Sequence, residues 1–226
     1  MKILPFGVAV IEDDTHVSKW VEQHGRLNIA EEMLAPFLKY VAPGSTVIDA
    51  GAMIGDHTVT YSEWVGERGR VIAFEPNPAA YECLIHNTSG MANVGCYRAG
   101  LSDADGETAM HVDKNAGRSH LGDGDGDRVL LMTLDSLELS DVSFIKIDVE
   151  GFESRVIAGA KDTIMNNRPA MLIEVNEGAL RRAGSSREWL IDLIRGLEYD
   201  TSITGPGIKW SDPQYDVICL PVEGVK

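Results

Sequence analysis

The stretch that most constrains the fold is 46–58, with the sequence TVIDAGAMIGDHT. It opens with a short β-branched, apolar run, which is typical of a strand buried on both faces. Asp49 ends this run, and Gly51 and Gly55 then frame a tight turn. The following segment, 57–64, has the pattern of a helix. A strand, a glycine turn and a helix start predict a site where the backbone comes close to a ligand and free amide groups attract polar atoms.

The spacing of these glycines differs from that of dinucleotide-binding proteins. The GxGxxG motif places glycine amides under a pyrophosphate group. This chain instead has Asp-x-Gly-x-x-x-Gly, with the acid ahead of the glycines. A carboxylate beside the turn suits a ligand that carries an ammonium group.

A second acid follows the next predicted strand. The run 71–74 is apolar, and Glu75 comes directly after it. This is about the separation at which Rossmann-like folds place an acid on a ribose diol. A carboxylate accepts two hydrogen bonds from a 2′,3′-diol and repels a 2′-phosphate, which disfavours NADP. Without Glu75, the turn could be a simple connection between a strand and a helix.

Composition restricts the partners. The chain has 35 Asp and Glu residues against 20 Lys and Arg residues, a net charge of −15. Such a protein repels phosphate backbones at long range, so we predict no nucleic-acid partner. No apolar run approaches the length of a membrane span, so we also predict no membrane partner. Three scattered cysteines are typical of reduced thiols and predict a cytoplasmic protein.

Predicted strands and helices alternate along the chain. Strands are expected at 46–48, 71–74, 94–97, 108–112, 129–133, 143–149, 170–175, 199–204 and 216–220. Helices are expected at 16–24, 29–40, 57–64, 78–87, 153–160 and 187–197. The last two strands are joined by too few residues for a crossover helix, which predicts an antiparallel pair at one sheet edge. The alternation predicts a mostly parallel, doubly wound sheet in one domain, 1–226, with 1–45 as a helical or hairpin extension.

The segment 113–127, DKNAGRSHLGDGDGD, is polar and rich in glycine. We expect a loop that is mobile without ligand. Every second residue from Asp123 to Asp127 is an acid, as in a calcium-binding loop. However, Arg128 and Leu134 stand where that loop needs glycine and glutamate. We therefore predict a solvated turn and no metal.

Three stretches together resemble the FkbM family of S-adenosylmethionine-dependent methyltransferases. They are VIDAGAMIGDHT (47–58), RVIAFEPNP (70–78) and FIKIDVEGFESRVIAGA (144–160), of which the IKIDVEG segment is the most specific. The resemblance implies a class I methyltransferase (Rossmann-like) fold: a doubly wound, seven-stranded, mostly parallel sheet with an antiparallel last strand. It implies S-adenosylmethionine as cofactor, and O-methylation of a small hydroxylated substrate such as a sugar or a natural-product intermediate.

The resemblance also implies which residues bind the cofactor. In chain order they are Asp49, Gly51, Gly55, Glu75, Asn77, Ser102, Asp103 and Asp148. The first three would surround the methionine part, the next two the ribose and the following two the adenine amino group. Asp148 would flank the methyl-transfer centre. Met53 is a departure, because the family usually has asparagine at this position. Ser119 and His120 match a serine-leucine region of the family and would close over the cofactor.

The catalytic candidates are Asp148, Glu150 and His120. The two carboxylates follow a predicted strand, where open α/β sheets bind ligands, and histidine titrates near neutrality. His57 is a weaker candidate of the same kind. Lys146 shares a strand face with Asp148, and an acid at 174 lies in the next strand. The alternative is thus a structural ion pair between Lys146 and either acid.

Two other functions remain open from the sequence. A non-catalytic cofactor-binding or assembly subunit could keep the same fold. An NAD-linked oxidoreductase is disfavoured by the spacing of the glycine turn and by the lack of a Tyr-x-x-x-Lys pair. Methyl transfer requires mainly alignment of nucleophile, carbon and leaving sulfur, so the lack of a strong base would not argue against the enzyme. The sequence leaves the oligomeric state undetermined.

Overall fold

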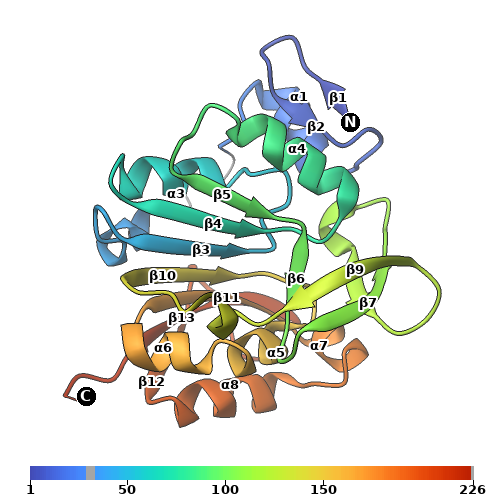
Figure 1. Ribbon diagram of the computed structural model, residues 1–226. Helices are drawn as coiled ribbons and strands as arrows, with labels where there is room; N and C mark the ends of the chain where they lie inside the picture. Colours follow the sequence, from blue (N-terminus) through green and yellow to red (C-terminus); the bar gives the residue numbers. More distant parts are fainter. Residues whose placement is uncertain (29–33, 225–226) are drawn as a thin grey trace.

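The computed structural model describes residues 1–28 and 34–224 and has a seven-stranded main sheet (Figure 1). The strand order is β12-β13-β11-β10-β3-β4-β5. The strands are β3 (Thr46–Ala50), β4 (Arg70–Phe74), β5 (Val94–Tyr97), β10 (Val142–Ile147), β11 (Ala170–Asn176), β12 (Tyr199–Ile203) and β13 (Gln214–Pro221). β13 runs antiparallel to both its neighbours, and the other neighbouring pairs are parallel. This confirms the predicted sheet, including its antiparallel last strand.

The last two strands form an antiparallel pair at one sheet edge, as predicted. β12 forms the sheet edge, whereas β13 lies between β12 and β11. The register pairs Glu174 with Asp216 and Asn176 with Gln214. The start of β13 therefore brings its polar side chains next to the carboxyl end of β11.

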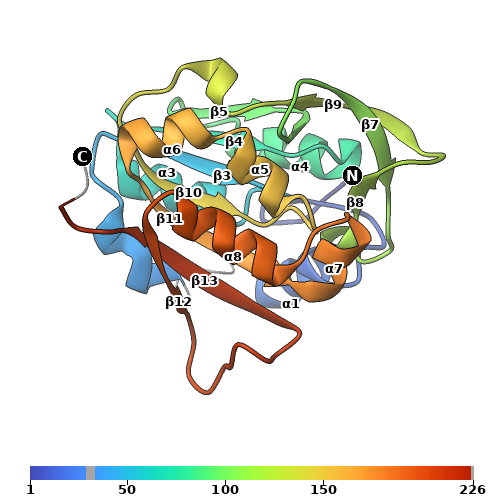
Figure 2. The same cartoon turned by 90° about the horizontal axis from the view of Figure 1, so that it is seen from below.

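Helices cover both faces of the main sheet (Figures 1 and 2). The helices are α1 (Val17–His24), α3 (Thr58–Val65), α4 (Pro78–Thr88), α5 (Glu153–Ala158), α6 (Lys161–Asn167), α7 (Glu177–Arg182) and α8 (Arg187–Gly196), and the 3-10 helices are η1 (Ala35–Tyr40), η2 (Ala116–Arg118) and η3 (Asp135–Leu137). Ile48 and Ile145 belong to the core under α5, α6 and α8. Val47 and Phe144 pack with η1 and α3 on the opposite face, because successive strand side chains alternate.

Two helix predictions need correction or restriction. The helix predicted at 153–160 ends at Ala158, and α6 begins at Lys161 as a separate helix. Of the helix predicted at 29–40, residues 29–33 lie outside the described residues, and 35–40 form a 3-10 helix. Pro36 lies in the first turn of this helix, where the missing backbone N–H has no helical partner to lose. No helix in the described part of the chain is long and apolar enough to cross a membrane.

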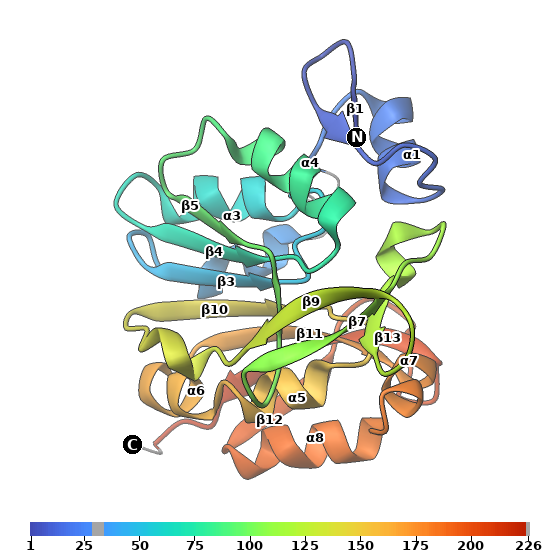
Figure 3. The same ribbon diagram turned by 45° about the vertical axis from the view of Figure 1, so that its right-hand side comes forward.

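A second sheet of four strands stands beside the carboxyl ends of the main sheet (Figure 3). It contains β6 (Ala99–Leu101), β7 (Gly106–His111), β8 (His120–Gly122) and β9 (Asp127–Met132) in the order β6-β9-β7-β8. Residues 120–122 belong to the segment predicted to be a loop, but they form β8 and pair with β7. Met110, Leu121 and Val129 pack on Phe152. This small core stabilises the three-residue strand β8, which is too short to be predicted from local propensity.

The N-terminal segment is tied to the rest of the fold by side-chain hydrogen bonds. β1 (Lys2–Ile3) and β2 (Ala9–Val10) pair as a hairpin ahead of α1. Asn87 on α4 donates to the Ala9 and Ile54 carbonyls at 2.9 and 2.8 Å, and its Oδ1 accepts from the Ala9 N–H at 2.7 Å. Farther along, the buried Asp14 accepts from the Ala116 N–H of η2 at 3.0 Å. The chain from β2 to α1 is thus held between α4 and η2.

We expect Asn87→Ala to loosen the N-terminal segment, because it removes all three of these hydrogen bonds. Amide exchange in residues 1–24 should accelerate, and the free energy of unfolding should fall by about 1–3 kcal/mol. Ser89→Ala is the matched control, since the exposed Ser89 hydroxyl donates only to a neighbouring carbonyl, that of His86. Equal exchange in the two variants would show that Asn87 does not hold the segment.

Candidate active site

A cavity of about 1090 Å³ lies at the carboxyl ends of the parallel strands. Its floor includes Gly51, Glu75 and Asp148 from the ends of β3, β4 and β10. The second sheet and η2 form one wall, and α1 forms another. Figure 3 shows α1 and the 113–119 segment facing each other across this end of the molecule. The site is therefore built from the main sheet and closed by elements outside it.

The two motif glycines have different structural roles. Gly51 has φ +83°, and a Cβ at this position would lie 1.8 Å from the carbonyl oxygen of Asp148. Gly51 thus allows the β3 turn to meet the end of β10. Gly55 has φ +93°, and a Cβ there would lie 3.1 Å from Leu84 on α4. Gly51 lines the cavity, whereas Gly55 lies behind it and permits close packing of α4.

Glu75 is a fixed acceptor in the cavity wall. Its side chain is buried, and its oxygens accept from the N–H groups of Met53 and Asn77, each at 2.8 Å. Burial raises the pKa of Glu75 to about 7, although the two backbone hydrogen bonds oppose that rise. Each carboxylate oxygen keeps a further lone pair for a ligand. Asn77 does not line the cavity and instead caps α4 by accepting from the Ala79 N–H.

Asp49 lies beneath the cavity rather than in its wall. It is fully buried, and the Thr58 hydroxyl donates to its Oδ2 at 2.6 Å. No hydrogen-bond partner for Oδ1 is found among the described residues. Burial raises the pKa of Asp49, and the neighbouring Lys146, its register partner on β10, opposes this rise. Asp49 therefore joins the start of α3 to the charged end of β10.

Ser102 and Asp103 also lie outside the cavity lining. The buried Ser102 hydroxyl donates to Asp103 Oδ1 at 3.0 Å, and that oxygen lies 3.5 Å from the Arg155 guanidinium. Their neighbours Gly100 and Leu101 line the cavity instead. This part of the chain therefore reaches the cavity through residues of β6. The side chains of Ser102 and Asp103 instead contact each other and Arg155.

A buried ion pair occupies the end of β10. Lys146 Nζ lies 3.0 Å from Asp148 Oδ2, and the two side chains are 7% and 34% exposed. Burial alone would lower the pKa of Lys146, but the carboxylates of Asp148 and Asp49 outweigh it and raise this pKa. Burial would raise the pKa of Asp148, yet Lys146 outweighs it and lowers that pKa. The ion pair considered from the sequence is thus formed with Asp148, which is anionic at neutral pH.

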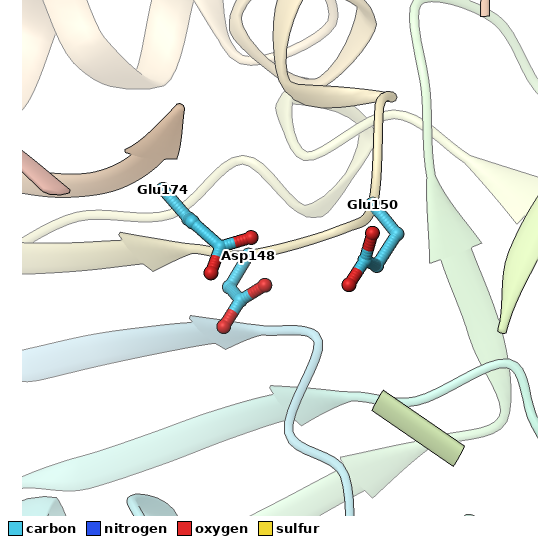
Figure 4. Close-up of side chains that lie close together, drawn as sticks. All are labelled: Asp148, Glu150 and Glu174. Carbon is cyan, nitrogen blue, oxygen red and sulfur yellow. The ribbon is translucent and has the colours of Figure 1, made fainter. Parts of the chain in front are cut away.

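Three carboxyl groups meet beside this ion pair. Oxygen atoms of Asp148, Glu150 and Glu174 all lie within 4.8 Å of one another, and the side chains point into the same space (Figure 4). Burial, followed by the charge of Asp148, raises the pKa of Glu150 to about 7 and that of Glu174 to about 9. Gln214 from β13 donates to Glu174 Oε1 at 2.8 Å. The prediction that no metal binds stays a prediction.

Both candidate histidines line the cavity. Burial, followed by the charge of Lys146, lowers the pKa of His57 to about 3. Burial also lowers the pKa of His120, whose ring stacks on His111 with centroids 5.1 Å apart. Both imidazoles are therefore neutral near pH 7.

Sequence reasoning missed several residues of the cavity. The cavity is also lined by His16 directly before α1, by Trp20 of α1 and by Arg118 of η2, although they belong to no motif. Their contribution depends on where the N-terminal segment docks, which local sequence does not encode. Arg182 on α7 also lines the cavity, and its guanidinium lies 3.9 Å from Glu150. Its position just after the carboxyl end of a parallel strand was an available signal.

Comparison with solved structures defines the class of fold. An FkbM methyltransferase from Methylobacillus flagellatus KT aligns with a TM-score of 0.54 and 17% identity over 78% of this chain, which spans 43% of that protein. A SAM-dependent O-methyltransferase from Thermotoga maritima aligns with a TM-score of 0.54 and 13% identity. This alignment covers 91% of this chain and 71% of that chain. Aeropyrum pernix fibrillarin with natively bound S-adenosyl-L-methionine aligns with a TM-score of 0.50 and 15% identity. This alignment covers 86% of this chain and 76% of that chain. The fold is that of class I methyltransferases.

The family follows from the sequence match. The family model described as "Methyltransferase FkbM domain" matches residues 49–200. The chain therefore belongs to the FkbM methyltransferase family, as its motifs implied. A search of curated proteins found no match.

We expect Met53→Asn to raise stability. Met53 has φ +51°, a left-handed conformation that costs a typical L-residue about 1–2 kcal/mol and that asparagine adopts more readily. The backbone N–H to Glu75 is kept, so the free energy of unfolding in denaturant should rise by about 0.5–1 kcal/mol. Met165→Asn, at an exposed helical position of α6, is the control and should lower stability. A fall for both variants would mean that the apolar contacts of Met53 outweigh its backbone strain.

Proposed function

We propose that this protein is an S-adenosylmethionine-dependent O-methyltransferase that acts on a small hydroxylated substrate, such as a sugar or a natural-product intermediate. The observation that carries the proposal is Glu75, a buried acceptor fixed in the cavity wall beside Gly51 and Asp148. Membership of the FkbM methyltransferase family supports it. The net charge of −15 continues to argue against a nucleic-acid substrate.

The residues of the cavity fit the cofactor. Glu75 has lone pairs available for a ribose diol, and the turn at Gly51 leaves space for the methionine part. Asp49 retains an unpartnered, buried Oδ1 close to this turn, which can take one further donor. Gly100 and Leu101 offer an apolar wall for the adenine, and contacts from Ser102 or Asp103 remain a prediction. When bound, the cofactor supplies an electrophilic methyl group.

The chain's own residues orient the acceptor and take up its proton. Asp148 is anionic, because Lys146 compensates the cost of burying its charge. Its backbone carbonyl meets the turn at Gly51, and its side chain lines the cavity just after β10. The carboxylate can there accept the proton of an acceptor hydroxyl group. Glu150 and His120 are the further candidates for this role and line the same cavity. The surrounding walls from α1 and η2 would limit access of water.

We expect Glu75→Ala to weaken S-adenosylhomocysteine binding by about 10–100-fold, because two charge-assisted hydrogen bonds to the ribose are lost. Titration calorimetry measures the affinity directly. Glu82→Ala changes an exposed acid of α4 and should bind as the wild type does. An unchanged affinity for a folded Glu75→Ala protein would remove Glu75 from the cofactor site.

We expect Asp148→Asn to lower turnover by about 10²–10⁴-fold, because the positioned proton acceptor is lost. Turnover is followed with methyl-labelled cofactor and a panel of sugars and other polyols. Stability should fall by about 1–3 kcal/mol, less than for a fully buried pair, since the Asp148 side chain is 34% exposed. A stable, fully active variant would exclude both the catalytic and the ion-pair role.

The binding and methyl-transfer assays on the wild-type protein together distinguish an enzyme from a non-catalytic subunit. S-adenosylhomocysteine binding together with methyl transfer to a hydroxylated substrate supports the proposal. Tight binding with no transfer to any substrate of the panel would favour a cofactor-binding or assembly role. Binding of NAD in place of S-adenosylhomocysteine would contradict both.

A further inference from the structure

Glu174 is a partly buried acid to which the proposed reaction gives no role. It lies on β11, and its Oε1 accepts from the Gln214 amide at 2.8 Å. Its Oε2 is buried and has no hydrogen-bond partner among the described residues. The neighbouring oxygen atoms belong to Asp148 and Glu150, which can only accept hydrogen bonds while they are ionised. Oε2 can therefore be satisfied there if it carries a proton.

The charges around Glu174 make a carboxylate at this position unfavourable. From β10 and the turn after it, Asp148 and Glu150 approach within 4.8 Å, and Asp216 of β13 lies opposite in the register. The nearby cations are already engaged: Lys146 pairs with Asp148, and Arg182 faces Glu150. Within the described residues, no ion pair is formed by Glu174. Like charges this close in a low dielectric do not all ionise, so one of these acids retains a proton.

Glu174 is the member of this group most suited to retain the proton. Asp148 has a buried ammonium as partner and Glu150 a guanidinium, whereas Glu174 has only a neutral amide. The pKa of Glu174, raised by burial and then by Asp148 to about 9, agrees with this. Asp216, the register partner of Glu174 on β13, is itself an acid and supplies no compensating positive charge.

We propose that Glu174 and Asp148 share one proton: a neutral Glu174 carboxyl group donates its Oε2–H to the Asp148 carboxylate and holds it in position for methyl transfer. Asp148 is then fixed by two donors, Lys146 on one side and Glu174 on the other. Its remaining lone pairs stay available to the acceptor hydroxyl. Glu174 is thus a positioning residue that acts through Asp148. The positioning role rests on the proposed function, whereas the protonation of Glu174 does not.

The protonation is tested without turnover. Carbon-13 NMR of protein labelled at the glutamate carboxyl carbon is recorded from pH 5 to 11, with Glu174→Gln to assign the signal. The Glu174 signal should keep the chemical shift of a protonated acid at pH 7 and titrate near 9. A Glu174 signal that titrates below pH 6 would overturn the proposal, even if the protein is a methyltransferase.

The positioning role is tested by two substitutions with the same methyl-transfer assay. Glu174→Gln keeps a neutral donor, because Gln214 directs the amide oxygen toward itself and leaves the NH₂ group facing Asp148. It should retain turnover within about 3-fold, whereas Glu174→Ala should lose about 10–100-fold with S-adenosylhomocysteine affinity unchanged. Thermal melts confirm that both variants are folded. A large loss in Glu174→Gln would show that the negative charge is needed and would overturn the proposal.

The pH profile gives an independent readout. Wild-type turnover should fall as the pH rises through about 9, because Glu174 then loses its donor proton and becomes a second anion beside Asp148. Lys146 stays charged in this range, since its pKa is raised, and so does not cause the fall. The alkaline fall should be absent in Glu174→Gln. The same fall in that variant, or activity lost with EDTA and restored by Mg²⁺, would instead assign the acids another role.

Discussion

The site depends on the attraction between the buried ammonium group of Lys146 and the carboxyl groups around it. Several acids converge on the carboxyl end of the main sheet, and a cavity lined by so many carboxylates would be unstable without a compensating cation. Lys146 Nζ lies 3.0 Å from Asp148 Oδ2, and Lys146 is the register partner of Asp49. Its charge also opposes the rise that burial causes in the pKa of Asp56. One side chain thus stabilises acids from β3, from the turn after it and from β10. This position also fixes the charge of Asp148, the residue closest to the proposed chemistry.

Around that cation the site divides into two halves with different construction. The proposed cofactor half is held by backbone groups: the amides of Met53 and Asn77 fix Glu75, and Gly51 meets the Asp148 carbonyl. Backbone groups thus determine the position of the Glu75 carboxylate in this half of the site. The other half of the cavity is lined by side chains from β11, β13, α1 and α7.

Much of the fold could be predicted from local sequence. The alternation of short apolar runs with amphipathic segments is enough to indicate a parallel sheet, and the short link before β13 indicates an antiparallel partner. In the second sheet, β7 and β9 correspond to predicted strands, but β6 and β8 could not be predicted in the same way. β8 has three residues and depends on pairing with β7 and on the packing of Leu121 near Phe152. These partners are remote in sequence, so no local pattern reports them.

By itself, the sequence determined the strand–turn–helix platform, the acid at the end of β4 and the charged end of β10, because each depends on neighbouring residues in one element. The tertiary structure decided which of the implied residues reach the cavity. Gly51, Glu75, Asp148, Glu150 and His120 line it, whereas Asp49, Gly55, Asn77, Ser102 and Asp103 support it from behind. The tertiary structure also decided that Glu174 lies beside Asp148 and that α1 forms a wall of the cavity. Those positions follow from strand order and from long-range packing, which bring together side chains that are distant along the chain.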